Sequence, residues 1–199
     1  MSSRPVIRYH FLKADMTAGH GKEPPWEKGE KRTATGDLEL CANGYHYGLT
    51  LLGALEYAPG PVFCRVRISG DRIEEGDKGC ARTRELVAWK NAEKELRLFA
   101  ADCAERALLR ERKDGSEPDP RSWAAVAVAR RYSNGEATQK ELARSSLAAS
   151  NAASSAASNA ASYASSAASN AASAASYAAS AVERKWQERR LRHYLKGVK

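Results

Sequence analysis

The sequence has no run of 18 apolar residues, so no membrane-spanning helix is expected. Its start, MSSRPVIRYHF, lacks the apolar core of a signal peptide, and we therefore expect a cytoplasmic protein. The chain contains four cysteines: Cys41, Cys64, Cys80 and Cys103. They are widely spaced and form no CxxC pair, which in a reducing compartment indicates reduced, mostly buried thiols.

The sequence also lacks a basic charge spread along its length. Of the net charge of +8, residues 183–199 carry +5, with seven basic and two acidic residues. A uniformly basic surface for nucleic acid is therefore not indicated. Two interpretations of the tail remain: contact with phosphate or an acidic partner, and a solvated helix end whose cations suit the C-terminal helix dipole.

One segment, residues 148–182, contains no charge, no glycine and no proline. Of its 35 residues, 18 are Ala and 11 are Ser, and its short units recur with a mean period near 3.67 residues. This period and the high helix propensity of Ala predict an α-helix. A single helix over about 137–195 and a hairpin broken near 151–155 or 159 both fit the pattern.

The Ala/Ser helix has little apolar area to bury, because each Ala contributes only a methyl group. It is stabilised only by close approach to another surface of small residues. The rest of the chain is too small to cover it, so we expect a homo-oligomer, most simply a dimer, that forms through this helix.

The remaining sequence divides into two patterns. Alternation and turn residues predict strands at 5–14, 37–41, 62–68 and 72–73, with one helix at 49–57. From Thr83 onward apolar residues recur at helical spacing, which predicts a helix over 84–112, a second over 123–132 capped by Ser122, and a capping box at Thr138 and Glu141. The fold class is therefore α+β, with a β-rich domain at 1–83 and a helical region at 84–199.

Three motifs in the second half carry a family resemblance: LFAADCAERAL, DPRSWAAVAVARRYSNGEAT and an Ala-rich repeat that ends in ERKWQERRL. In this order they resemble the alanine-rich immunity proteins of bacterial polymorphic toxin systems. The resemblance covers about half of the chain. It implies a protein that binds and blocks another protein, which requires no catalytic residues.

The first half carries YHFL, ELCANGYH, ALEYAPGPVFCRV and a Gly-Asp-Lys stretch at 76–78. These motifs resemble an uncharacterised domain of phage genomes that occurs fused to the immunity-like module. The resemblance implies a phage or prophage origin and supplies no activity.

The order of polar residues in this half also resembles that of ADP-ribosyltransferases, in which a His and a Tyr hold NAD and a Glu supports transfer. The candidate residues are His10, Tyr45 or Tyr47, and Glu74 or Glu75, with His46 and Tyr57 as further ligand-binding residues. We therefore keep a nucleotide-binding cleft around His10 and Tyr45 as an alternative.

Other sites are weaker. Cys41 and His46, five residues apart, would need Cys64 or Cys80 to complete a metal site, and their spacing does not indicate one. Trp26 and Trp89 are typical of core or domain-interface residues. The sequence thus predicts a non-catalytic, phage-associated accessory protein of immunity or anti-defence type, which binds a host, toxin or defence protein or a small ligand. The alternative is an enzyme or nucleotide-sequestering protein that uses NAD or a related nucleotide.

Overall fold

The computed structural model describes residues 4–19, 21, 23–161 and 169–198, with the backbone alone described for 151–161 and 169–180. The chain falls into two contact units, described separately below: residues 1–93 with 188–199, and residues 94–187. The strands are β1 (Val6–Leu12), β2 (Lys31–Thr33), β3 (Tyr45–Gly48), β4 (Val62–Glu75) and β5 (Lys78–Asn91). The helices are α1 (Leu51–Glu56), α2 (Glu93–Lys113), α3 (Pro120–Ser133), α4 (Gln139–Ala161) and α5 (Ser169–Tyr194).

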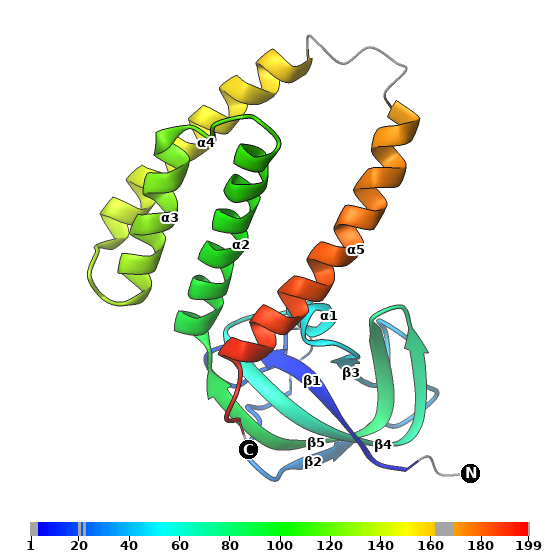
Figure 1. Cartoon of the computed structure of the whole chain (residues 1–199). Coiled ribbons are helices and arrows are strands. Elements are labelled where there is room, and N and C mark those ends of the chain that lie inside the picture. The colour runs from blue at the N-terminus through cyan, green and yellow to red at the C-terminus, as the bar shows by residue number, and fades with distance from the viewer. Residues whose placement is uncertain (1–3, 20, 22, 162–168, 199) are drawn as a thin grey trace. The chain divides into compact units, whose positions relative to one another are not determined.

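The sheet of the first unit is antiparallel and closes on itself (Figure 1). β4 and β5 form a long hairpin, and their turn contains Gly76 with φ 61°, a conformation that glycine adopts without strain. β1 pairs with both β4 and β3, and β3 returns to β5, so the pairings form a closed circuit. β2 adds to β5 at residues 83–85. Irregularities at Arg65/Val66 and Ser69/Arg72 bend the hairpin and permit closure.

The inner face of this sheet forms the main hydrophobic core. It is fully buried at Cys64, Ile68 and Ala81, and Trp26 from the loop before β2 completes it. A second aromatic cluster joins Tyr9, Phe11 and Phe63, with ring centroids 6.1 and 5.5 Å apart. Burial of such side chains supplies most of the driving force for folding.

The end of α5 belongs to the β-rich unit, although it lies more than a hundred residues away in sequence. Leu191 is fully buried and Leu195 is 5% exposed. The Glu188 carboxylate accepts hydrogen bonds from the backbone N–H groups of Leu51 and Leu52 at the start of α1, at 3.2 and 3.0 Å. The C-terminal segment is therefore a structural part of the β-rich unit.

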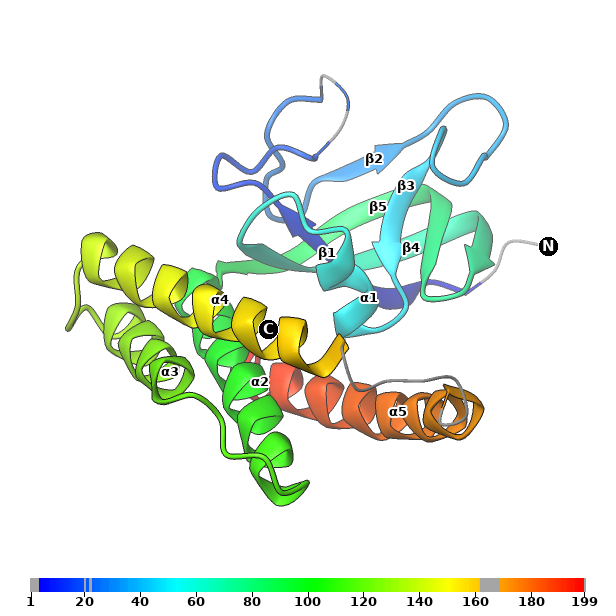
Figure 2. The same cartoon turned by 90° about the horizontal axis from the view of Figure 1, so that it is seen from above.

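The second unit is helical, and Figure 2 shows α3 lying beside α4. Buried Asp102 of α2 forms an ion pair with Arg130 of α3 at 2.8 Å. Glu183 of α5 pairs with Arg106 and Arg110 of α2 at 2.8 and 3.1 Å. Ion pairs therefore link α2 to both α3 and α5 within the helical unit.

Several predictions about the elements are confirmed. The fold is α+β, with an antiparallel sheet followed by helices. The capping box is present: Thr138 Oγ1 accepts from the Glu141 N–H at 3.2 Å, and Glu141 accepts from the Thr138 N–H at 2.7 Å. In the Ala/Ser segment α4 runs unbroken through 151–161, so the break expected near 151–155 or 159 is wrong, and α5 begins at Ser169. The choice between one helix and a hairpin depends on 162–168, which lie outside the described residues.

Other predictions about the elements are wrong. The helix expected from residue 84 is strand β5 as far as Asn91, and α2 begins only at Glu93, so the expected boundary at residue 83 falls inside a strand. α3 is capped by Asp119, whose carboxylate accepts from the Arg121 N–H, and Ser122 lies inside the helix. Residues 37–41 form a turn region with an isolated Glu39–Asn43 bridge, whereas 72–73 are strand as predicted but belong to β4.

None of the helices in the described part of the chain combines the length and the apolar composition that a membrane span requires.

Candidate functional site

A buried arginine organises the polar interior of the β-rich unit. Arg84 of β5 is 3% exposed, and its Nη1 donates to the carbonyl oxygen of His46 at 2.9 Å. Its guanidinium lies over the ring of Trp26 at 4.4 Å and over that of Tyr45 at 5.1 Å. Burial lowers the pKa of Arg84 to about 10, and the nearby Glu23 carboxylate opposes that shift. Arg84 is therefore a buried cation held mainly by aromatic faces.

His10 of β1 lies beside this cation. Burial lowers the pKa of its imidazole well below 6.5, and the charges of Arg84 and His46 lower it further. His10 is consequently neutral at physiological pH. Its Nε2 is buried and has no hydrogen-bond partner among the described residues. A buried polar atom without a partner carries an energetic cost, which is a feature of ligand sites as well as of structural compromises.

The structure brings together some of the predicted residues and separates others. His10, Tyr45 and His46 surround Arg84, and Trp26 meets Tyr45 edge-on at 5.6 Å. Burial and then the Glu23 carboxylate raise the pKa of Tyr45, so its phenol stays protonated.

Glu74 makes its contacts elsewhere in the β-rich unit. It accepts from the Tyr47 hydroxyl at 2.9 Å and pairs with Arg8 at 3.4 Å. Tyr57 is 54% exposed, with the Lys78 ammonium 5.1 Å from its ring centroid. Glu74 is therefore joined to Tyr47, the alternative to Tyr45, and no hydrogen bond or ion pair among the described residues joins it to Tyr45.

Cys41 and His46, the candidate metal ligands, lie in and just after a turn and are joined by a hydrogen bond. The Cys41 N–H donates to His46 Nε2 at 2.8 Å, so this nitrogen accepts a backbone hydrogen bond and is not free to ligate a metal. Cys41 is exposed with φ 69°, and Lys78 Nζ lies 3.4 Å from its sulfur. Within the part of the chain that the structure describes, no group of three His, Cys, Asp or Glu side chains is arranged to hold a metal ion.

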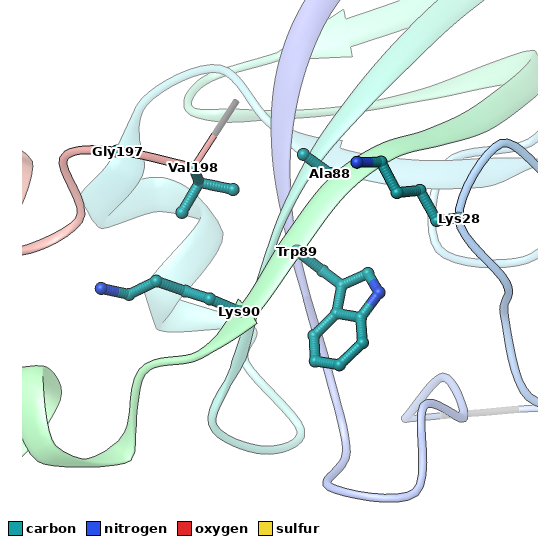
Figure 3. Close-up of a pocket in the computed structure, with 6 residues that line it drawn as sticks. All are labelled: Lys28, Ala88, Trp89, Lys90, Gly197 and Val198. Carbon is teal, nitrogen blue, oxygen red and sulfur yellow. The ribbon is translucent and has the colours of Figure 1, made fainter.

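A surface groove of about 370 Å³ lies beside the end of β5 (Figure 3). Its lining residues are Lys28, Ala88, Trp89, Lys90, Gly197 and Val198. Of the two tryptophans predicted to lie in the core or at a domain interface, Trp26 is buried in the core and Trp89 is 45% exposed, so Trp89 is not a core residue. An exposed tryptophan between two lysines is typical of a contact surface, since Trp is enriched among the residues that dominate binding energy.

Sequence reasoning missed both the Arg84 cluster and this groove. Arg84 carries no motif, and a surface position is the ordinary expectation for an arginine. The groove depends on the return of Gly197 and Val198 to β5, which local sequence does not encode. Buried and accessible residues alternate along β5 from Arg84 to Trp89, so assignment of this stretch as a strand would have placed Arg84 and Trp89 on opposite faces.

These features define a mixed α+β protein. Its closed β-sheet unit includes residues 188–199, which contain the C-terminal end of α5. The chain belongs to the family described as Imm-5 like putative immunity protein, which it matches over residues 87–197. Residues 6–97 match a second family, a domain of unknown function designated DUF7666. The two matches overlap at 87–97, where Trp89 and Lys90 lie. No curated protein and no solved structure matches the chain.

Proposed function

We propose that this chain is an immunity-type accessory protein that neutralises a toxin or defence protein by forming a stoichiometric complex, without catalysis. Membership of the immunity family over 87–197 carries the proposal. The exposed Trp89 supports it, because it places a large apolar contact inside the segment that both family matches share. The basic C-terminal end of α5 supports an acidic partner. Action in the cytoplasm and a phage or prophage origin complete the proposal.

Affinity capture with the full chain, followed by reconstitution of the captured protein, tests this function. The expected result is a complex of fixed stoichiometry in which the partner loses its toxic or enzymatic activity. A captured protein that stays fully active when saturated with the chain would overturn the proposal. Any partner that binds only through the affinity tag is identified with tag-only bait, which serves as the control.

A second candidate function is the binding of a nucleotide or similar anion near His10 and Tyr45. It is favoured by Arg84, a buried cation that forms no ion pair with an acidic side chain among the described residues. Aromatic faces and a cation suit a base and a phosphate. Calorimetric titration with NAD tests it: saturable binding that is lost in Tyr45→Ala supports this function, and no heat at millimolar NAD excludes NAD as the ligand.

Self-association through the Ala/Ser helix remains a proposal. Its support is the sequence of 148–182, whose small side chains favour close backbone approach. Light scattering at micromolar concentration tests it: twice the chain mass of 21.6 kDa supports a dimer, and a mass of 21.6 kDa excludes one.

A further inference from the structure

The groove beside Trp89 lies on an open edge of the sheet. Residues 83–85 of β5 pair with β2, and Leu86 exchanges hydrogen bonds with Gly29 N–H at 2.7 Å and Glu30 C=O at 2.9 Å. Beyond Leu86, Val87 is bulged out of the ladder, and residues 88–91 pair with β4 alone in the described part of the chain. A strand paired on one side presents alternate N–H and C=O groups on the other, and these groups accept an added strand.

Lys28 lies where the segment before β2 stops pairing with the edge of β5. Because Gly29 is bonded to Leu86, Lys28 is the first residue past the paired segment. Figure 3 shows its side chain reaching back toward β5, with Trp89 and Lys90 on opposite sides of the strand. The open stretch, 87–91, is long enough for a segment of about five residues, or roughly 17 Å of extended chain.

The side chains that line the groove carry positive charge and no negative charge. Lys28 and Lys90 line it, and the Lys90 ammonium also donates to the carbonyl oxygen of Tyr194 at 3.5 Å. Arg65, the neighbour of Ala88 across the ladder, donates from Nη1 to the carbonyl oxygen of Val198 at 2.9 Å, so a third cation lies at the border of the groove. A ligand that fits this surface carries carboxylates beside the lysines and an apolar side chain on the Trp89 indole.

We propose that the open edge of β5 at residues 87–91 binds an extended, acidic segment of the partner protein by strand addition, with Trp89 as its apolar anchor and Lys28 and Lys90 as its charge partners. This inference rests on the proposed immunity-type function and names the surface and the chemistry of its partner. Main-chain hydrogen bonds provide affinity in this binding mode, and the flanking side chains provide selectivity.

A second copy of the chain is a poorer occupant of the same edge. Pairing of two β5 edges would bring the lysines of both copies together, and like charges that face each other across a ladder are destabilising. Lysines at an exposed edge are also a recognised means by which proteins prevent such self-pairing. An acidic strand from another protein places opposite charges beside these lysines, and that arrangement is attractive.

A phage-displayed library of random nine-residue peptides, selected on the full chain, provides the test. The enriched peptides are expected to carry Asp or Glu alternating with β-branched or aromatic residues and to lack central proline. Anisotropy titrations with an enriched synthetic peptide are expected to show about tenfold weaker binding to Trp89→Ala and to Lys28→Glu. Ile73→Ala, which alters an exposed apolar side chain outside the groove, is the control and keeps full affinity.

Enrichment of peptides without acidic residues, or equal affinity for Lys28→Glu, would overturn the inference. A concentration-dependent doubling of mass that Trp89→Ala abolishes would assign the edge to a second copy instead. Lys28→Glu lies in an exposed loop, so it keeps the test decisive if Trp89→Ala unfolds the protein. If the captured partner is neutralised equally well by wild type and both groove variants, the docking surface is wrong while the immunity function stands. If peptides bind as expected but no partner is neutralised, the surface stands and the function fails.

Discussion

The Glu188 carboxylate lies 3.0 Å from the backbone nitrogen of Leu52, across 136 positions of sequence. It satisfies N–H groups at the start of α1 that have no partner within the helix, while Thr50 accepts from the Gly53 N–H at 3.0 Å. A carboxylate here also interacts favourably with the helix dipole. The immunity-family segment thus supplies a cap to a helix of the β-rich unit.

Replacement of this carboxylate should destabilise the β-rich unit. We expect Glu188→Ala to lower the free energy of unfolding by about 1–2 kcal/mol, the usual cost of a lost N-terminal cap. Glu188 also pairs with Arg192 at 3.0 Å, so Arg192→Ala serves as the control for that exposed ion pair and should cost less than about 1 kcal/mol. Urea denaturation measures both, and equal losses in the two variants would show that the cap contributes nothing.

The neutral state of His10 predicts a pH dependence of stability. Its pKa is depressed in the folded protein, whereas an unfolded histidine titrates near about 6.5. Below that pH the unfolded chain binds a proton that folded His10 does not, so the free energy of unfolding falls as pH falls, by up to about 1.4 kcal/mol per pH unit.

His10→Leu removes this contribution, and we expect its unfolding free energy to decline less steeply between pH 6.5 and 5. Denaturant titrations across that range measure the slope, with exposed His193→Leu as the matched control. Identical slopes in wild type and His10→Leu would show that His10 takes up its proton at the same pH in the folded and unfolded chains.

The cysteines should differ sharply in reactivity. Burial raises the pKa of Cys64 to about 12, and burial followed by nearby Glu183 and Asp102 raises that of Cys103 to about 11. Cys80 is fully buried, and only Cys41 is exposed. Titration of the native protein with a thiol reagent should therefore show one fast equivalent, which Cys41→Ser removes. Fast labelling of three thiols would contradict the buried assignments.

The pair between Asp102 and Arg130 should stabilise the helical unit. Asp102 is 5% exposed, and Arg130 also contacts Glu105 at 2.6 Å. Arg130→Met removes the ion pairs with both carboxylates, one of them buried, so it should cost about 2–3 kcal/mol, a figure reduced for the part-exposed guanidinium. Arg131→Met, whose pair with Glu141 spans 3.7 Å at the surface, should cost under about 1 kcal/mol. Thermal denaturation that affects both variants equally would contradict the assignment.

Local features were predictable from the sequence and long-range ones were not. Thr138 and Glu141 lie three residues apart, so their capping box could be recognised directly. β5 was mistaken for a helix because Leu86, Trp89 and Leu96 happen to follow helical spacing, and because the strand contains the buried cation Arg84. The pairing of β5 with β4 and β2 over these residues shows that they form a strand.

The candidate site divides in the same way. His10, Tyr45 and His46 could be recognised in the sequence as candidate site residues. Arg84, around which the structure places them, belongs to no sequence motif and could not. The groove at Trp89 requires the C-terminal segment to return across most of the chain. Tertiary contacts of this kind leave no periodic signal in the sequence.

The most direct test of a non-catalytic immunity function is a titration of the captured partner's activity with the purified chain. With the partner held well above the dissociation constant, we expect activity to fall linearly and to reach zero at a fixed equivalence point, without added NAD. Inactivation by a small fraction of an equivalent, increasing with time and requiring NAD, would show turnover and contradict the account.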